Sequence, residues 1–222
     1  MRGLGRRLGF GLVLALAVPA LAADDPAPVF EVEYTNPGLT PSHWLLTLNP
    51  DGSGHFHSDR GDGPHDPAQG FEAANVDRDI HVSVDYAGRV FSTARQQKLF
   101  SKSNCDSHMK VAFQGWKKFS YRGPDGAGSC AFNYAKDKDV QALGESLVAV
   151  AEAILEGARL EVLLQHDPLG LNKEMEFLTE AAGDGRVQEI ETIQGILTRL
   201  AEDECVMDIV RRRARALLPR QN

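Results

Sequence analysis

The chain has 222 residues, of which 42% are hydrophobic and 25% are charged, and its 31 acidic residues outnumber its 24 basic ones to give a net charge of -7. This length is enough to bury the core of one domain or of two small ones. An acidic chain lacks the basic surface that general binding to nucleic acid or to an anionic membrane requires, so the composition argues against both roles.

The first 22 residues have the pattern of a secretory signal peptide. Three arginines lie within the first seven positions, an apolar run follows, and the segment ends in Ala-Leu-Ala at residue 22; this is the order of charged, apolar and small-residue regions that such signals share. The apolar run is shorter than the roughly 20 residues that span a bilayer, so we expect cleavage after Ala22 and no permanent membrane anchor. Without this segment the chain has 21 basic residues against 31 acidic ones, and we expect a periplasmic or secreted protein.

Residues 29–134 are expected to form an antiparallel sheet. Apolar and polar side chains alternate in short segments, as they do in strands with one buried and one wet face. Turn residues separate the segments, for example the Asn-Pro-Asp-Gly of residues 49–52. Two strands, at 119–121 and 130–134, flank a glycine-rich hairpin, and 90–100 is expected to form a short helix. The other side chains expected to face inward from strands are Phe30, Val32, Tyr34, Trp44, Leu46, Leu48, Phe56, Ile80, Val82, Val84, Met109, Val111 and Phe113.

Near Asp137 the spacing of apolar residues changes from two to three and four, the period of a helix with one buried stripe. Glycine and proline interrupt this pattern and divide it into about four helices, whose short connections favour antiparallel packing. The expected stripe residues are Leu143, Leu147, Val150, Ile154, Ala158, Leu171, Met175, Leu178, Val187, Ile190, Ile193, Leu197 and Leu200. Strands followed by helices predict an α+β fold. We expect a β-rich domain of about six strands at 23–135 and a helical domain at 136–222.

Two of the three cysteines, Cys105 and Cys130, flank neighbouring strand segments. Exported proteins mature in oxidising compartments, so we expect these two residues to form a disulfide. Closing a loop of this length contributes roughly 3 to 4 kcal/mol in the chain-entropy account. Cys205 is expected to stay reduced, as a small buried hydrophobe beside Val206 and Ile209 on an apolar helix stripe.

The stretch GHFHSDRGDGPHD contains three histidines among glycine and acidic residues. His55 and His57 are two apart on an expected strand, so both imidazoles project from the face opposite Phe56. Together with His65 on the following loop they are candidate zinc ligands. A polar hairpin end that binds no metal tightly explains the same residues, and we favour it because spacing alone often gives false matches. The loop at 59–76 is long, and long loops in compact domains are often functional.

The sequence contains no established catalytic or cofactor motif. A nucleophile elbow, a zinc-protease helix, a phosphate-binding loop and a dinucleotide glycine motif are all missing. Asp79, His81, Ser83 and Asp85 include the residue types of a hydrolytic triad, but side-by-side positions on one strand face do not give triad geometry. We therefore assign no catalytic residue and no cofactor.

Three functions from different classes remain open. The first is an exported, non-catalytic protein that binds another envelope protein. The second is a metal-assisted hydrolase that uses the region of His55 and His57. The third is a carrier that holds a small apolar ligand between the sheet and the helices. They require, respectively, an exposed patch, converging histidines and carboxylates, and a pocket.

Overall fold

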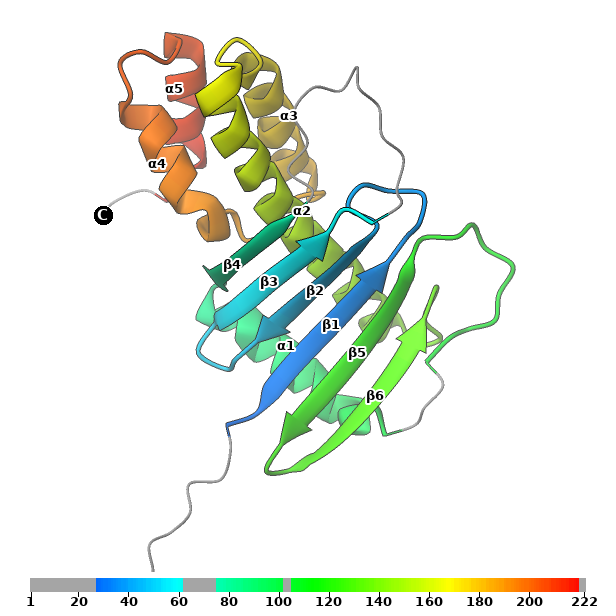
Figure 1. The fold of residues 1–222 in the computed structure, drawn as a ribbon. Coiled ribbons are helices and arrows are strands. Elements are labelled where there is room, and N and C mark those ends of the chain that lie inside the picture. Colours follow the sequence, from blue (N-terminus) through cyan, green and yellow to red (C-terminus); the bar gives the residue numbers. More distant parts are fainter. Residues whose placement is uncertain (1–26, 62–74, 102–104, 220–222) are drawn as a thin grey trace, which may run out of the picture.

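A computed structural model of the chain describes residues 27–61, 75–101 and 105–219. It has the expected α+β architecture, in which a six-stranded antiparallel sheet is followed by a helical half (Figure 1). The strands lie in the order β4-β3-β2-β1-β5-β6. Their bounds are β1 Val29–Thr35, β2 His43–Leu48, β3 Ser53–Asp59, β4 Val76–His81, β5 Trp116–Gly123 and β6 Gly126–Phe132. The α-helices are α1 Val84–Gln96, α2 Lys138–His166, α3 Leu171–Asp184, α4 Gln194–Glu202 and α5 Asp208–Leu217, with short 3-10 helices η2 at Lys98–Phe100 and η3 at Ile190–Ile193.

The strand alternation places one face of the sheet against helices α1 and α2, which lie behind the sheet in Figure 1. Aromatic residues dominate this inner face. Phe30, Phe119 and Phe132 are fully buried, and their rings meet edge to face at centroid distances of 5.4 and 5.1 Å. Burying an aromatic side chain of this size contributes about 1.5 to 3 kcal/mol. The wet face of the predicted strands is therefore the opposite one, which carries the polar residues.

Helix α2 is shared by two hydrophobic cores. Its first half, through residues such as Leu147 and Val150, packs in the core formed by the sheet and α1. Its second half, including Leu160 and Leu163, packs in a second core with α3, α4 and α5. The sheet and the helical half are therefore connected by one continuous helix of 29 residues.

Two polar contacts reinforce this connection at the β4 edge of the sheet. Arg78 on β4 donates from both of its Nη atoms to the carboxylate of Glu161 on α2, at 3.2 and 2.8 Å. Glu189, just before η3, accepts hydrogen bonds from the backbone N–H and the hydroxyl of Ser83, at 2.7 and 3.2 Å. Both contacts join the edge of the sheet to the helical half.

The predicted disulfide is present. Cys105 and Cys130 are bonded, with their Cα atoms 5.6 Å apart. The bond fixes the chain that precedes β5 to the edge strand β6, and the isolated bridge between Asp106 and Ala135 extends this attachment.

Two strand predictions were wrong. Ile80, as predicted, is buried on β4, but the strand ends at His81, because the side chain of Ser83 accepts the Tyr86 N–H and begins helix α1. Val84 is consequently the first helical residue, and it is exposed. The alternating residues Met109, Val111 and Phe113 do not form a strand either. Met109 and Phe113 are 63% and 51% exposed. His108, which precedes these residues, has a left-handed backbone with φ 57°, a conformation that strands do not adopt.

The environment predicted for Cys205 was also wrong. Its thiol is free, as expected, but the residue is exposed in the turn between α4 and α5 and does not lie on a helix stripe. Within 27–61, 75–101 and 105–219, none of the helices combines the length and the apolar character that crossing a membrane would require.

Candidate functional site

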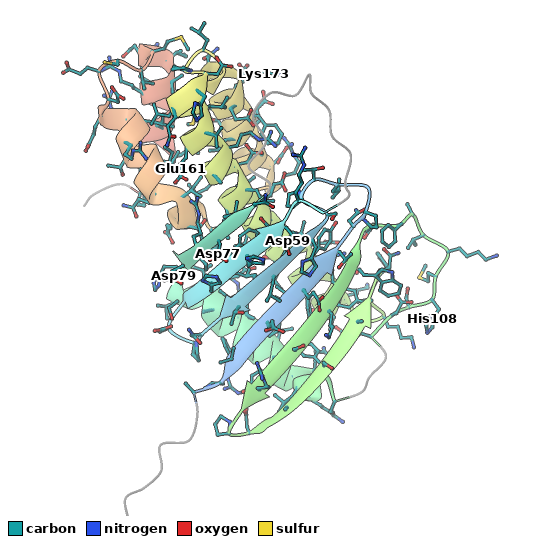
Figure 2. All side chains as sticks on the ribbon, viewed as in Figure 1. Asp59, Asp77, Asp79, His108, Glu161 and Lys173 are labelled. Atoms are coloured by element: carbon teal, nitrogen blue, oxygen red, sulfur yellow. A yellow bond between two sulfur atoms is a disulfide. The ribbon has the colours of Figure 1, made fainter. Side chains whose placement is uncertain are left out.

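The candidate site is the open face of the sheet, the face opposite α1 and α2. Among the described residues no helix lies over this face, which is turned toward the viewer in Figure 1. Figure 2 shows Asp59, Asp77 and Asp79 on it, over the strands β3 and β4. These residues alternate with the buried positions of the same strands, for example Phe56 and Ile80. The binary pattern of the strands therefore gathers the polar residues on the open face.

The register of the sheet places histidines directly opposite aspartates. His55 on β3 is the cross-strand partner of Asp79 on β4, and His57 is the partner of Asp77. On the other side of β3, Asp59 is opposite His43 on β2. Directly opposite side chains have Cβ atoms about 4.5 to 5.5 Å apart, which is close enough for a hydrogen bond or an ion pair.

The first half of the resulting network runs along β3 and β4. His55 contacts two aspartates, with Nδ1 at 2.9 Å from Asp79 and Nε2 at 3.3 Å from Asp77. His57 repeats this arrangement, with Nδ1 at 2.7 Å from Asp77 and Nε2 at 3.4 Å from Asp59. Carboxylates and imidazoles thus alternate without interruption through these five residues.

The second half crosses β2 and β1 to β5. His43 lies with Nδ1 at 3.6 Å from Asp59 and Nε2 at 3.3 Å from Glu33. Glu33 in turn accepts a hydrogen bond from the ammonium of Lys118 at 3.3 Å. We refer to the complete series as the acid–base ladder. Its members are Asp79, His55, Asp77, His57, Asp59, His43, Glu33 and Lys118.

The geometry favours the protonated form of His57. A neutral imidazole donates from one ring nitrogen only, whereas His57 presents both nitrogens to carboxylates. The hydrogen bond to Asp77 raises the pKa of His57, and the neighbouring charges of Asp59 and Asp77 act in the same direction. Partial burial opposes ionisation of Glu33, but hydrogen bonds from Lys118 and His43 outweigh it and lower the pKa of Glu33.

The ladder is accessible and its charge depends on pH. Its side chains are between 33% and 95% exposed, the lowest value being that of His43 and the highest that of Asp79. With neutral imidazoles, its four carboxylates and one ammonium give a net charge of -3, and protonation of His57 reduces this charge to -2. Histidine is the side chain whose ordinary pKa makes such a change possible near neutral pH.

The predicted zinc ligands are only partly brought together. His55 and His57 share the open face of β3, as expected, whereas His65 lies outside the described residues. Within the described part of the chain, no group of three or more histidine, cysteine, aspartate or glutamate side chains is arranged to hold a metal ion. The favoured interpretation, a polar hairpin end that binds no metal tightly, and the zinc alternative both stay predictions, which metal analysis of protein purified without a histidine tag would distinguish.

The sequence did not lead us to expect that Asp77 and Asp79 on β4 are partners of these histidines. The signal was nevertheless present, because Asp77 and Asp79 have the same i, i+2 spacing as His55 and His57. Using that signal required the register of β3 against β4, and the loop between these strands is too long to fix a register by its length. Because this loop separates β3 from β4 in the sequence, the contribution of β4 to the site was not predicted.

Of the four alternating residues Asp79, His81, Ser83 and Asp85, only Asp79 and His81 lie on one strand, β4. Asp79 belongs to the ladder, Ser83 is the N-cap of α1, and Asp85 is in the first turn of that helix. His81 is the last residue of β4. These positions do not form a nucleophile, a base and an orienting acid in series.

Buried aromatic and aliphatic side chains form the core between the sheet and helices α1 and α2. Three cavities open at the surface beside α2. Each has charged residues in its wall, for example Lys117 in the first, Arg89 in the second and Lys138 in the third. These walls favour polar ligands over the apolar ligand of the carrier hypothesis, which stays a prediction.

Comparisons of the chain with protein-family models, with curated proteins and with solved structures find no match. The functional argument consequently depends on the geometry and the charges of the site.

Proposed function

We propose that this is an exported, non-catalytic binding protein whose open sheet face docks onto a basic surface of another envelope protein. The observation that carries this proposal is the acid–base ladder, which concentrates four carboxylates on an uncovered face. Opposite charges on two surfaces steer their encounter and select the partner.

The ladder is suited to docking because its side chains are already ordered. Each imidazole is held between two carboxylates, and the backbone beneath them is hydrogen-bonded on both sides in β1, β2 and β3. Ordering a side chain at an interface costs about 0.5 to 1.5 kcal/mol, so groups held in place before binding reduce this cost. A basic segment of the partner would form ion pairs with the carboxylates, and the sheet would not need to rearrange.

The same arrangement predicts a direction for the effect of pH. Lowering the pH protonates His57 and makes the net negative charge of the ladder smaller. A basic partner should therefore bind more weakly in acid. In the proposed function the histidines thus make docking sensitive to the pH of the compartment.

The experiment measures the affinity of the mature protein for a short fluorescent peptide of alternating lysine and serine, by anisotropy at low ionic strength. We expect the double variant Asp77→Asn/Asp79→Asn to bind about fivefold more weakly than the wild type, since two exposed charges contribute on the order of 1 kcal/mol together. The matched control is Glu180→Gln/Glu191→Gln, which removes two exposed carboxylates from the helical half.

Equal weakening by both double variants would show that only the total charge matters and would contradict docking at the open face. Failure of the wild type to bind the peptide more tightly than an uncharged serine peptide would contradict the proposal as well. Circular dichroism of each variant establishes that the fold is retained, which we expect because the changed side chains of Asp77 and Asp79 are 68% and 95% exposed.

A further inference from the structure

Lys117 is a buried lysine on the inner side of the sheet. It follows the exposed Trp116 on β5 and is only 3% exposed, although lysine is among the residues that are almost never fully buried without a partner. Helix α2 has a glycine, Gly144, at the position where it packs against the side chain of Lys117. A Cβ atom added at Gly144 would lie 3.0 Å from Cδ of Lys117 and 3.2 Å from the ring of Phe132.

The ammonium of Lys117 has incomplete partners. It donates to the carbonyl oxygen of Gly115 at 3.3 Å and lies 5.7 and 5.8 Å from the ring centroids of Tyr34 and Phe132. An ammonium has three N–H donors, of which this hydrogen bond uses one. Among the described residues no carboxylate pairs directly with it, and Glu145 acts on it only through its charge. Burial lowers the pKa of Lys117 and Glu145 opposes this effect, as expected for a cation that lacks a close counter-ion.

This ammonium lies in the wall of a cavity of about 430 Å³, a volume within the range of small-molecule sites. Gln114 lines the cavity beside the lysine, and the aliphatic side chains of Val148 and Ala149 on α2 provide an apolar wall. Glu145 lies on the same helix, one turn earlier. The cavity therefore combines a buried cation, an exposed carboxylate and an apolar surface.

The remaining charged groups of the wall compensate each other. Arg186 donates through Nε to Asp184 at 2.8 Å, so this pair adds little net charge. Glu145 accepts a hydrogen bond from Gln141 at 2.8 Å and keeps lone pairs for another donor. Lys117 and Glu145 are therefore the two groups that a ligand would complete, the first with an anion and the second with a cation.

We propose that this cavity binds a small zwitterion of the α-amino acid class, whose carboxylate pairs with Lys117 and whose ammonium faces Glu145. A carboxylate would supply the counter-ion that the buried lysine lacks, and the apolar wall would contact the ligand side chain. The carboxylate of Glu145 disfavours a multiply charged anion such as phosphate, because like charges in one pocket repel. This site lies on the helical side of the sheet and is independent of the docking function proposed for the open face.

The experiment measures binding of each of the twenty common L-amino acids, added singly, to the mature protein by isothermal titration. For an amino acid that binds, the N-acetyl form, which lacks the ammonium, and the α-amide, which lacks the carboxylate, are tested as well. Lys117→Met is the principal variant and Lys173→Met is the matched control, since Lys173 is exposed on α3 and does not line the cavity.

We expect at least one amino acid to bind the wild type, with about tenfold or greater loss of affinity for its amide, its N-acetyl form and the Lys117→Met protein. Lys173→Met should bind like the wild type, and Glu145→Gln should weaken binding of the zwitterion but not of its N-acetyl form. Methionine preserves the aliphatic stem of Lys117 and removes a buried charge, so this variant should fold. Absence of binding for all twenty amino acids, equal binding by Lys117→Met, or equal binding of the N-acetyl form would each overturn the proposal.

Discussion

A single buried carboxyl group shows how burial controls ionisation in this chain. Glu156 on α2 is 2% exposed, and its Oε2 atom has no hydrogen-bond partner among the described residues. Its Oε1 atom lies 3.8 Å from Arg159, which itself pairs more closely with Glu174 at 3.2 Å. Burial, reinforced by the nearby carboxylate of Glu174, raises the pKa of Glu156 to about 9. The group is therefore a neutral acid in the folded protein at neutral pH.

This assignment predicts a pH-dependent effect of Glu156→Gln. Because the pKa is higher in the folded chain than in the unfolded one, the wild type loses stability as the pH rises from about 5 toward 9. Glutamine has no proton to lose, so the variant should match the wild type near pH 5 and exceed its free energy of unfolding increasingly up to about pH 8. Urea denaturation at several pH values measures the difference, with Glu180→Gln on the exposed side of α3 as the control. A constant difference between Glu156→Gln and the wild type would contradict a raised pKa.

Sequence alternation predicted the strands well where one face is buried. Phe30, Trp44 and Phe56 all face the core as expected, because each lies on a strand with partners on both sides. The same alternation failed at Met109 and Phe113, where the chain leaves the sheet and no strand of the described chain pairs with it. Pattern alone cannot indicate whether a partner strand is available, since that depends on pairings remote in sequence.

The disulfide attaches the segment that follows Cys105 to strand β6. The variant Cys105→Ser/Cys130→Ser should lose about 3 kcal/mol in free energy of unfolding, the amount expected for release of a loop of 25 residues. Urea denaturation of the oxidised wild type and of the variant measures this loss. Cys205→Ser is the control and should change stability by less than about 0.5 kcal/mol, because the residue is exposed in a turn. A comparable loss in the control would contradict the structural role of the Cys105–Cys130 bond.

The acid–base ladder could not be predicted from residue patterns or from single strands, because it depends on how the strands pair. The sequence predicted that His55 and His57 share a wet face, and the structure agrees. Their acidic partners come from β4, and the contact with His43 comes from β2. The site thus depends on the strand order β4-β3-β2, which the sequence pattern alone does not specify.

For the whole molecule, we expect helix α2 to couple the two cores into one cooperative unit, because it contributes to both. Leu147 is fully buried in the first core and Leu160 in the second, and both lie on the same continuous helix. We expect Leu147→Ala and Leu160→Ala each to lower the free energy of unfolding by about 2 to 5 kcal/mol. Each variant should unfold in a single transition that is the same by tryptophan fluorescence, which reports on Trp44 and Trp116, and by far-ultraviolet circular dichroism. Separate transitions by the two probes would show that the halves unfold independently.

The measurement that tests docking at the open face most directly is the pH dependence of affinity for the lysine–serine peptide. The wild type should bind more weakly near pH 5 than near pH 8, because protonation of His57 between Asp59 and Asp77 lowers the net negative charge of the ladder. The triple variant His43→Gln/His55→Gln/His57→Gln should keep its affinity nearly constant over the same range. The account is contradicted if the triple variant weakens in acid as the wild type does, or if acidification strengthens binding of the wild type.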